Sequence, residues 1–285
     1  MTNNTLHRIE NVFLSNEDLS SAIDLIKSLH DVDFSGYGKE SLRRRFNRLM
    51  IINNWSTYYE LKFSITNGKL PVTDILSEIT VNMTSMFRDV NFYKAAKTSL
   101  FPYLETFPSF KIWHAGCSTG EEMYSFSILM EEAGLLKKST QYGTDLNQEA
   151  LKVAKKGVYQ LKEMASYAKN YMECGGVKPF SDYYVAKYNA VKMLSLLSKR
   201  MVFSQHNLVN NSSFNEFECV VCRNVLIYFN KELKNRVLKL FYDSICPRGF
   251  LLLGGAESIK GTVVENLFEV IDGNNKIYRK KISYE

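Results

Sequence analysis

Short apolar runs alternate with helical stretches from residue 110 onward, and this alternation constrains the fold more than any other feature. Phe110–Ala115 and 140–145 are each followed by a stretch of helical periodicity, and Phe217–Cys222 is followed by another from Lys231. Further short apolar runs lie at 201–205 and 250–254. Strands that alternate with helices form βαβ units, whose strands run parallel. The sequence therefore predicts an α/β fold with a mainly parallel sheet.

The last part of the chain departs from this parallel pattern. Segments 267–271 and 276–280 flank Asp-Gly-Asn-Asn at 272–275, which is typical of a hairpin turn. We therefore expect the sheet to end in an antiparallel strand. Residues 165–199 fit neither period, and Gly175-Gly176 indicates a small insertion with turns of its own.

The N-terminal part of the chain has only helical periodicity. Segments 17–30 and 39–52 carry apolar residues at the spacing of one helix face, and Asn67-Gly68 interrupts the pattern. We expect an all-helical domain over 1–80 and a second domain over 81–285 that contains the insertion.

The composition is that of a soluble globular protein, with 45% hydrophobic and 23% charged residues among 285. No apolar run approaches the roughly 18–20 residues that cross a bilayer, and the polar N-terminus does not resemble a secretory signal. Five cysteines, an odd number, favour reduced thiols and a cytoplasmic protein. The net charge of +6 is too small to indicate a nucleic-acid partner.

The loop after the first predicted strand carries the strongest indication of a ligand. It reads Ala-Gly-Cys-Ser-Thr-Gly-Glu-Glu at 115–122, where Ser118 and Glu121 have the spacing of a capping box. A dinucleotide site requires G-x-G-x-x-G and a nucleotide P-loop requires a lysine, and neither is present. Because Glu121 and Glu122 would repel a pyrophosphate, the loop favours S-adenosylmethionine (SAM), which has a sulfonium, an amino acid tail and no phosphate.

Asp145 ends the second predicted strand, where a carboxylate can accept hydrogen bonds from both ribose hydroxyls. Asn147 follows and is expected to cap the next helix. The alternative is that Asp145 and Glu122 are only charges at helix N-termini. Their occurrence in consecutive βα loops favours the cofactor.

These residues complete a pattern that resembles the CheR-type chemotaxis receptor methyltransferases, which use SAM to esterify glutamate side chains of bacterial chemoreceptors. The resemblance covers about residues 8–282. It rests on five blocks in order, at 82–88 (Asn-Met-Thr-Ser-Met-Phe-Arg), 115–122, 143–145 (Gly-Thr-Asp), 222–229 (Cys-Arg-Asn-Val-Leu-Ile-Tyr-Phe) and 249–257. It implies a helical N-terminal domain, a Rossmann-like SAM-binding domain with a small inserted antiparallel β subdomain, and S-adenosylhomocysteine (SAH) as product.

The resemblance also implies roles for single residues. Arg88 and Tyr228 match positions that orient the reacting carboxylate, and a helix over 82–90 would place Thr84 and Arg88 on one face. Met123 and Gly255-Ala256 depart from the family pattern, and the insertion lacks the Gly-Thr-Gly turn of members that dock a receptor tail. The positions that match cofactor contacts are Asn82, Thr84, Arg88, Glu122, Asp145, Asn207, Leu208, Arg223 and Asn224.

The expected chemistry needs few groups, because a glutamate is already ionised at pH 7 and no general base is required. Among four histidines we find no convincing nucleophile–base or metal constellation. Cys219 and Cys222 could suggest a redox or zinc pair, but on a strand they point to opposite faces, which favours small core residues. His114 is interpreted as packing or a local hydrogen bond.

A basic cluster lies in the second predicted helix, with Arg43, Arg44, Arg45 and Arg48. It has three interpretations: a solvated face, a nucleic-acid contact, or docking onto the acidic helical bundle of a chemoreceptor, which the resemblance favours. Two other functions stay open beside a receptor glutamate methyltransferase. They are a regulatory module that binds SAM without catalysis and a nucleic-acid methyltransferase on the same fold.

Overall fold

The computed structural model describes residues 14–80, 84–209 and 212–282. The contacts divide the chain into two compact units, one of Met1–Val81 with Tyr228–Lys234 and one of Asn82–Ile227 with Asn235–Glu285.

The first unit is helical, as the sequence predicts. Two of its helices begin with complete capping boxes, in which Ser15 pairs with Asp18 and Thr57 pairs with Glu60. These boxes satisfy the backbone N–H groups that every helix N-terminus leaves open. The helices are α1 (Asn16–His30), α2 (Lys39–Ile52), α3 (Tyr58–Thr66) and α4 (Val72–Ile79).

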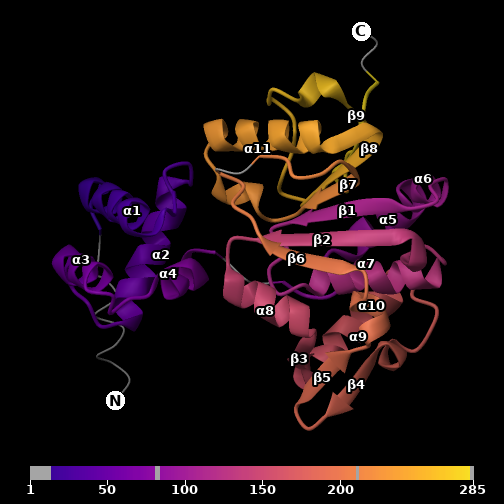
Figure 1. The fold of residues 1–285 in the computed structure, drawn as a ribbon, viewed down its shortest axis with the longest axis horizontal. Coiled ribbons are helices and arrows are strands. Elements are labelled where there is room, and N and C mark those ends of the chain that lie inside the picture. Colours follow the sequence, from indigo (N-terminus) through magenta and orange to yellow (C-terminus); the bar gives the residue numbers. More distant parts are fainter. Residues whose placement is uncertain (1–13, 81–83, 210–211, 283–285) are drawn as a thin grey trace. The chain divides into compact units, whose positions relative to one another are not determined.

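A seven-stranded sheet forms the centre of the second unit, in the order β6-β2-β1-β7-β8-β10-β9 (Figure 1). Strands β6, β2, β1, β7 and β8 pair in parallel, and β10 runs antiparallel to both β8 and β9. The predicted mainly parallel sheet with an antiparallel end is therefore confirmed. The strands are β1 (Phe110–Ala115), β2 (Ser139–Asp145), β6 (Met201–Gln205), β7 (Phe217–Cys222), β8 (Ile245–Leu253), β9 (Phe268–Asp272) and β10 (Ile277–Lys280).

Helices cover both faces of this sheet, as a parallel sheet requires. Ile112 of β1 shares a hydrophobic core with α5 (Val90–Ser99), α6 (Phe101–Glu105) and α7 (Glu121–Glu132). The next residue, Trp113, points to the other face and packs edge-on against Phe241 of α11 (Lys231–Ser244). Helix α8 (Gln148–Lys156) packs beside β2 and β6, and the side chain of Asn147 caps its N-terminus as predicted.

The insertion is a small antiparallel sheet in the order β3-β5-β4, drawn at the bottom of Figure 1. Its first strand starts upstream of the predicted range at 165. Glu132 ties the insertion to α7, because one of its carboxylate oxygens accepts hydrogen bonds from both the Tyr171 and Tyr183 hydroxyls. The elements are β3 (Val158–Gln160), α9 (Met164–Glu173), β4 (Tyr184–Lys187), β5 (Ala190–Met193) and α10 (Ser195–Ser198).

Candidate active site

The strand order reverses between β1 and β7. Strands β2 and β6 follow on one side of β1, whereas β7 and β8 follow on its other side. Open α/β sheets bind ligands at such a switch point, outside the carboxyl ends of the strands. The loops after β1, β2, β6 and β7 meet here, and together they contain most of the predicted cofactor positions. We refer to this region as the cofactor edge.

The loop between β1 and α7 makes two close approaches that only glycine allows. Gly116 has φ +77°, and a Cβ there would lie 2.5 Å from Cγ2 of Val225 in the loop after β7. Gly120 has φ +90°, and a Cβ there would lie 2.8 Å from the Cβ of Ala154 in α8. The two glycines therefore let the loop between β1 and α7 pack against the loop after β7 and against α8.

The predicted capping box of Ser118 and Glu121 is wrong. Helix α7 starts from Gly120 and has no side-chain cap, and Ser118 adopts a left-handed backbone conformation with φ 49°. The Thr119 hydroxyl instead donates to the Glu121 carboxylate at 2.6 Å. A contact from another strand explains the difference, because the Ser118 N–H donates to Asp145.

Asp145 ties two loops of the cofactor edge together. One carboxylate oxygen accepts from the Ser118 N–H at 2.8 Å and the other from the Asn147 N–H at 2.9 Å. Its side chain is buried, and burial raises the pKa of Asp145 although the backbone N–H groups of Asn147, Ser118 and Leu146 oppose the rise. A carboxylate offers about four acceptor sites, so Asp145 keeps capacity for a further donor.

Glu122 and Arg223 form a buried ion pair across the switch point. A guanidinium nitrogen of Arg223 lies 3.1 Å from Glu122, and another lies 2.7 Å from Asp89 and 3.2 Å from the Arg88 carbonyl. The guanidinium also stacks on Phe92, with 3.8 Å from Cζ to the ring centroid. Burial alone would raise the pKa of Glu122, but the hydrogen bond from His114 and the charge of Arg223 hold this pKa below its usual value.

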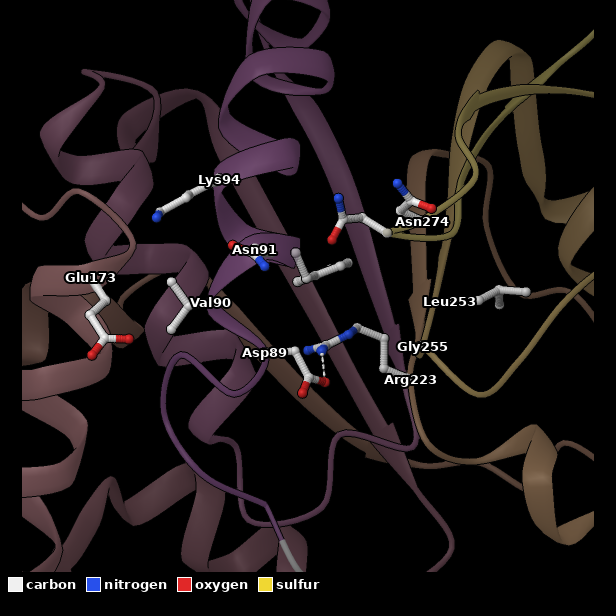
Figure 2. Close-up of a pocket in the computed structure, with 11 residues that line it drawn as sticks. Asp89, Val90, Asn91, Lys94, Glu173, Arg223, Leu253, Gly255 and Asn274 are labelled. Atoms are coloured by element: carbon white, nitrogen blue, oxygen red, sulfur yellow. Dashed lines mark hydrogen bonds and ion pairs between the residues drawn. The ribbon is translucent and has the colours of Figure 1, made fainter.

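Arg223 and Asp89 also line an open pocket of about 500 Å³ beside the cofactor edge. Figure 2 shows the two side chains pointing toward each other, with Lys94 and Glu173 on one side of the pocket and Asn274 on the other. Arg223 thus contributes both to the ion pair with Glu122 and to the wall of this pocket.

The segment before α5 is not the helix that would place Thr84 and Arg88 on one face. Phe87 has φ 54° and Asp89 has φ 63°, and α5 begins only at Val90. The buried Phe87 N–H donates to the Ser125 hydroxyl of α7 at 2.9 Å, so tertiary contacts set this turn. Arg88 is partly exposed, and its Nε lies 3.9 Å from Asp89.

The remaining predicted positions fall in different places. Asn82 lies outside the described residues. Asn207 and Leu208 follow β6 and are half-buried, and the Asn207 side chain accepts from the Val209 N–H at 2.9 Å. Tyr228 ends the short 3₁₀ turn Leu226–Tyr228 and belongs to the helical unit, whereas Arg88 belongs to the α/β unit. The catalytic pairing of Tyr228 with Arg88 stays a prediction.

Glu257 is a residue of this region that the sequence analysis did not select. Its buried carboxylate accepts four backbone hydrogen bonds, from three consecutive residues after β7 and from Gly254 after β8. The distances are 3.0 Å to Asn224, 2.9 Å to Val225, 2.7 Å to Leu226 and 2.6 Å to Gly254. One carboxylate therefore shapes the loop that carries Arg223 and Asn224. The sequence indicates this role only through the position of Glu257 at the end of the block 249–257, one of the five blocks of the resemblance.

We expect Glu257→Ala to lower the free energy of unfolding by about 3–5 kcal/mol, because it leaves four buried N–H groups without an acceptor. Urea denaturation measures the loss. The matched control is Glu265→Ala, since Glu265 accepts one exposed N–H, from Gly261 at 2.7 Å, and should cost less than about 1 kcal/mol. Equal losses in the two variants would contradict the assigned role.

Comparison with known proteins identifies the family. Residues 82–277 match the family described as "CheR methyltransferase, SAM binding domain". The chain belongs to the CheR methyltransferase family. It is 39% identical to the "Putative methyltransferase Cher3" of Pseudomonas putida, over 90% of this chain and 94% of that protein. Two further relatives carry the name "Chemotaxis protein methyltransferase". The relative from Listeria monocytogenes is 28% identical over 80% of this chain and 85% of its own length, and that from Pseudomonas aeruginosa, numbered 1, is 32% identical over 75% and 80%.

Membership in the CheR family makes this chain a SAM-dependent methyltransferase with a Rossmann-like fold and SAM as its cofactor. The groups at the cofactor edge fit that ligand. Glu122 and Arg223 present one anion and one cation, as a zwitterionic amino acid tail requires, and Asp145 presents acceptors for hydroxyl groups. The Nε of Arg223 is buried without a hydrogen-bond partner. No lysine lies in the loop at 115–122 to attract a phosphate.

The basic cluster of α2 divides into two kinds of arginine. Arg43 is buried and binds Glu40 at 2.6 Å and the side chain of Asn16, so it belongs to the packing of α1 against α2. Arg44 and Arg48 are exposed, and Arg48 pairs with Glu78 at 3.1 Å. Arg45 is half-buried.

The described part of the chain shows the state of the cysteines and whether side chains gather as a metal site. All five cysteines are buried and unpaired, and burial raises the pKa of Cys219 and Cys222 well above the usual thiol value. No three side chains of His, Cys, Asp and Glu gather as a metal site within 14–80, 84–209 and 212–282. Within the same ranges, no helix is long and apolar enough to cross a membrane.

Proposed function

We propose that this CheR-family methyltransferase esterifies glutamate side chains of chemoreceptors. The observation that carries the proposal is the placement of Glu122, Asp145 and Arg223 at the cofactor edge, in a chain of this family. Glu122 lies in the first turn of α7, Asp145 ends β2 and Arg223 follows β7. The names of its chemotaxis relatives support a receptor as the substrate.

In this proposal the cofactor edge divides its work among neighbouring loops. Glu122 and Arg223 bind the amino acid tail of SAM, and Asp145 accepts from the ribose hydroxyls. When bound, SAM supplies an electrophilic methyl group on a sulfonium. The other residues that we propose to contact the cofactor are Asn82, Thr84, Arg88, Asn207, Leu208 and Asn224.

The reaction needs orientation more than acid–base chemistry. A carboxylate oxygen of the substrate forms the bond to the methyl carbon while the carbon–sulfur bond breaks, and no proton moves. Arg88 is proposed to hold the carboxylate, because a planar guanidinium can bind one oxygen and leave the other free. Tyr228 is proposed to help in this alignment, and near-attack positioning of this kind supplies up to about 7–11 kcal/mol.

Receptor binding is proposed for the helical part of the chain. We propose a domain boundary near residue 80, with 1–80 as the docking domain and 81–285 as the methyltransferase domain. Arg44, Arg45 and Arg48 are the docking residues, because they keep exposed or half-exposed charge on one helix. The buried Arg43, which was included in the predicted cluster, is assigned to packing instead.

The experiment is a transfer assay with methyl-labelled SAM and cytoplasmic fragments of candidate receptors, with and without their C-terminal tails. We expect base-labile label on the fragment, as a methyl ester requires, and loss of label when the accepting glutamates are changed to glutamine. Base-stable label, or label on added RNA or DNA, would contradict the proposal. SAM binding without any transfer would favour a regulatory module.

The docking surface has its own prediction. Arg44→Glu combined with Arg48→Glu is expected to weaken binding of the receptor fragment about tenfold or more at low salt, because each reversal replaces attraction by repulsion. SAH affinity should not change. The matched control is Lys62→Glu on α3, an exposed reversal in the same unit. Equal weakening by the control, measured by surface plasmon resonance, would remove the assignment.

A further inference from the structure

A chain of hydrogen bonds runs through the core beneath the cofactor edge and ends on Glu122. Its side chains are His114 of β1, Gln141 of β2 and Ser127 of α7, and none is more than 1% exposed. Burial of polar groups is costly unless each finds a partner. The direction of each hydrogen bond can therefore be derived in turn, from Ser127 at one end of the series to Glu122 at the other.

The far end fixes the orientation of Gln141. The Ser127 hydroxyl has one hydrogen and donates it to the Leu197 carbonyl at 2.9 Å. Its oxygen therefore accepts from the amide nitrogen of Gln141, at 2.6 Å. The amide oxygen of Gln141 then faces Nε2 of His114 at 3.0 Å, so that Nε2 must carry a hydrogen.

The near end requires a second hydrogen on the same ring. Nδ1 of His114 lies 3.0 Å from one carboxylate oxygen of Glu122. The other oxygen of Glu122 accepts from Arg223 at 3.1 Å, which keeps the carboxylate ionised and able only to accept. Nδ1 must therefore donate as well, and the ring is an imidazolium.

The alternative is a neutral ring with the Gln141 amide turned over. The Ser127 hydrogen would then point to the Gln141 oxygen. The Ser127 and Leu197 oxygens would face each other at 2.9 Å with no hydrogen between them. The arrangement with two ring hydrogens gives every polar group in this series of hydrogen bonds a partner, whereas the arrangement with a neutral ring does not.

We propose that His114 is a positioning residue that carries hydrogens on both ring nitrogens and holds Glu122 in place at the cofactor edge. Glu122 then lies between two cations, His114 and Arg223, and its carboxylate is fixed before the cofactor arrives. This inference rests on the proposed role of Glu122 in binding the amino acid tail of SAM.

Other titratable and charged groups surround His114 and Glu122. Asp89 lies on the far side of Arg223. Burial raises the pKa values of Tyr93 and Cys219, so both stay neutral, and Arg223 stays charged because Glu122 raises its pKa against the effect of burial. Phe126 of α7 packs edge-on against the imidazole at 5.2 Å between ring centroids and carries no charge.

The first test locates the hydrogens directly. Nitrogen-15 labelling of the four histidines, with His114→Phe to assign the signal, should show both ring nitrogens of His114 bonded to hydrogen at pH 7. Gln141→Met removes the acceptor of Nε2, and its spectrum should show only one protonated nitrogen. A single protonated nitrogen in the wild-type ring would overturn the proposal.

The second test measures SAH affinity by calorimetry. His114→Phe keeps an aromatic ring and should weaken SAH binding about tenfold at pH 7. The matched control is Tyr124→Phe on α7, the helix that carries Glu122. This substitution removes a buried hydrogen bond to the Ala154 carbonyl at 3.2 Å and leaves the hydrogen bonds of Glu122 in place.

The outcomes separate this inference from the proposed function. If Glu122→Gln binds SAH as well as the wild type, the assigned role of Glu122 is wrong. If Glu122→Gln weakens binding but His114→Phe behaves like Tyr124→Phe, Glu122 keeps its role and His114 does not position it.

Discussion

An Asp145→Ala variant is expected to bind SAH at least about 100-fold more weakly than the wild type. The proposed role gives Asp145 two hydrogen bonds to ribose hydroxyls, and bonds to a charged acceptor contribute about 1.5–3 kcal/mol each. Two of them correspond to roughly a hundredfold in affinity or more. The carboxylate is buried and is held in place by the Ser118 and Asn147 N–H groups.

The same substitution also removes a carboxylate that accepts from loop N–H groups, so the control must share that effect. Asp272→Ala does so, because Asp272 ties the turn between β9 and β10 through Asn275, with bonds of 2.9 and 2.8 Å. Calorimetric titration with SAH should show near-normal affinity for Asp272→Ala. Asp145→Ala with wild-type affinity would contradict the ribose assignment, whatever its effect on stability.

An Arg88→Ala variant is expected to lower the single-turnover rate of methyl transfer about 100-fold or more while SAH affinity falls only a few-fold. Losing a group that aligns or stabilises the transition state typically costs 10²–10³ in rate. The affinity should suffer less, because Arg223 holds the Glu122 side of the cofactor edge through contacts that do not use the Arg88 side chain.

Two further variants make this prediction specific. Arg88→Lys keeps the charge but not the planar fork, and we expect it to recover only part of the rate. Arg200→Ala removes an exposed arginine elsewhere in the α/β unit and should react at the wild-type rate. If Arg88→Ala lost affinity and rate in equal proportion, Arg88 would be a cofactor contact only.

The sheet and its ends could be predicted because their patterns are local. The apolar run of β1, the cap at Asn147 and the hairpin of β9 and β10 depend on neighbouring residues in the chain. The start of β8 was predicted too late, at 250 instead of Ile245. Pro247 and an Arg248 with φ 64° interrupt the apolar run there.

The cofactor edge could be predicted as residue types but not as geometry. Ser118 lost its capping role to a contact with Asp145, which lies 27 residues away. The turn before α5 is set by the contact of Phe87 with Ser125, and the loop after β7 by Glu257, more than 30 residues away. The sequence pattern places Arg43 with the docking arginines, since all of them lie on one predicted helix. Its burial depends on the packing of α1 against α2, which the sequence does not reveal.

Mass spectrometric mapping of the methylated product tests the central claim most directly. A receptor cytoplasmic fragment incubated with SAM and the wild-type protein should gain methyl groups on glutamate side chains, and the Arg88→Ala protein should add almost none in the same time. Methylation of lysine or arginine nitrogens, or of nucleic acid in place of the receptor, would contradict the account.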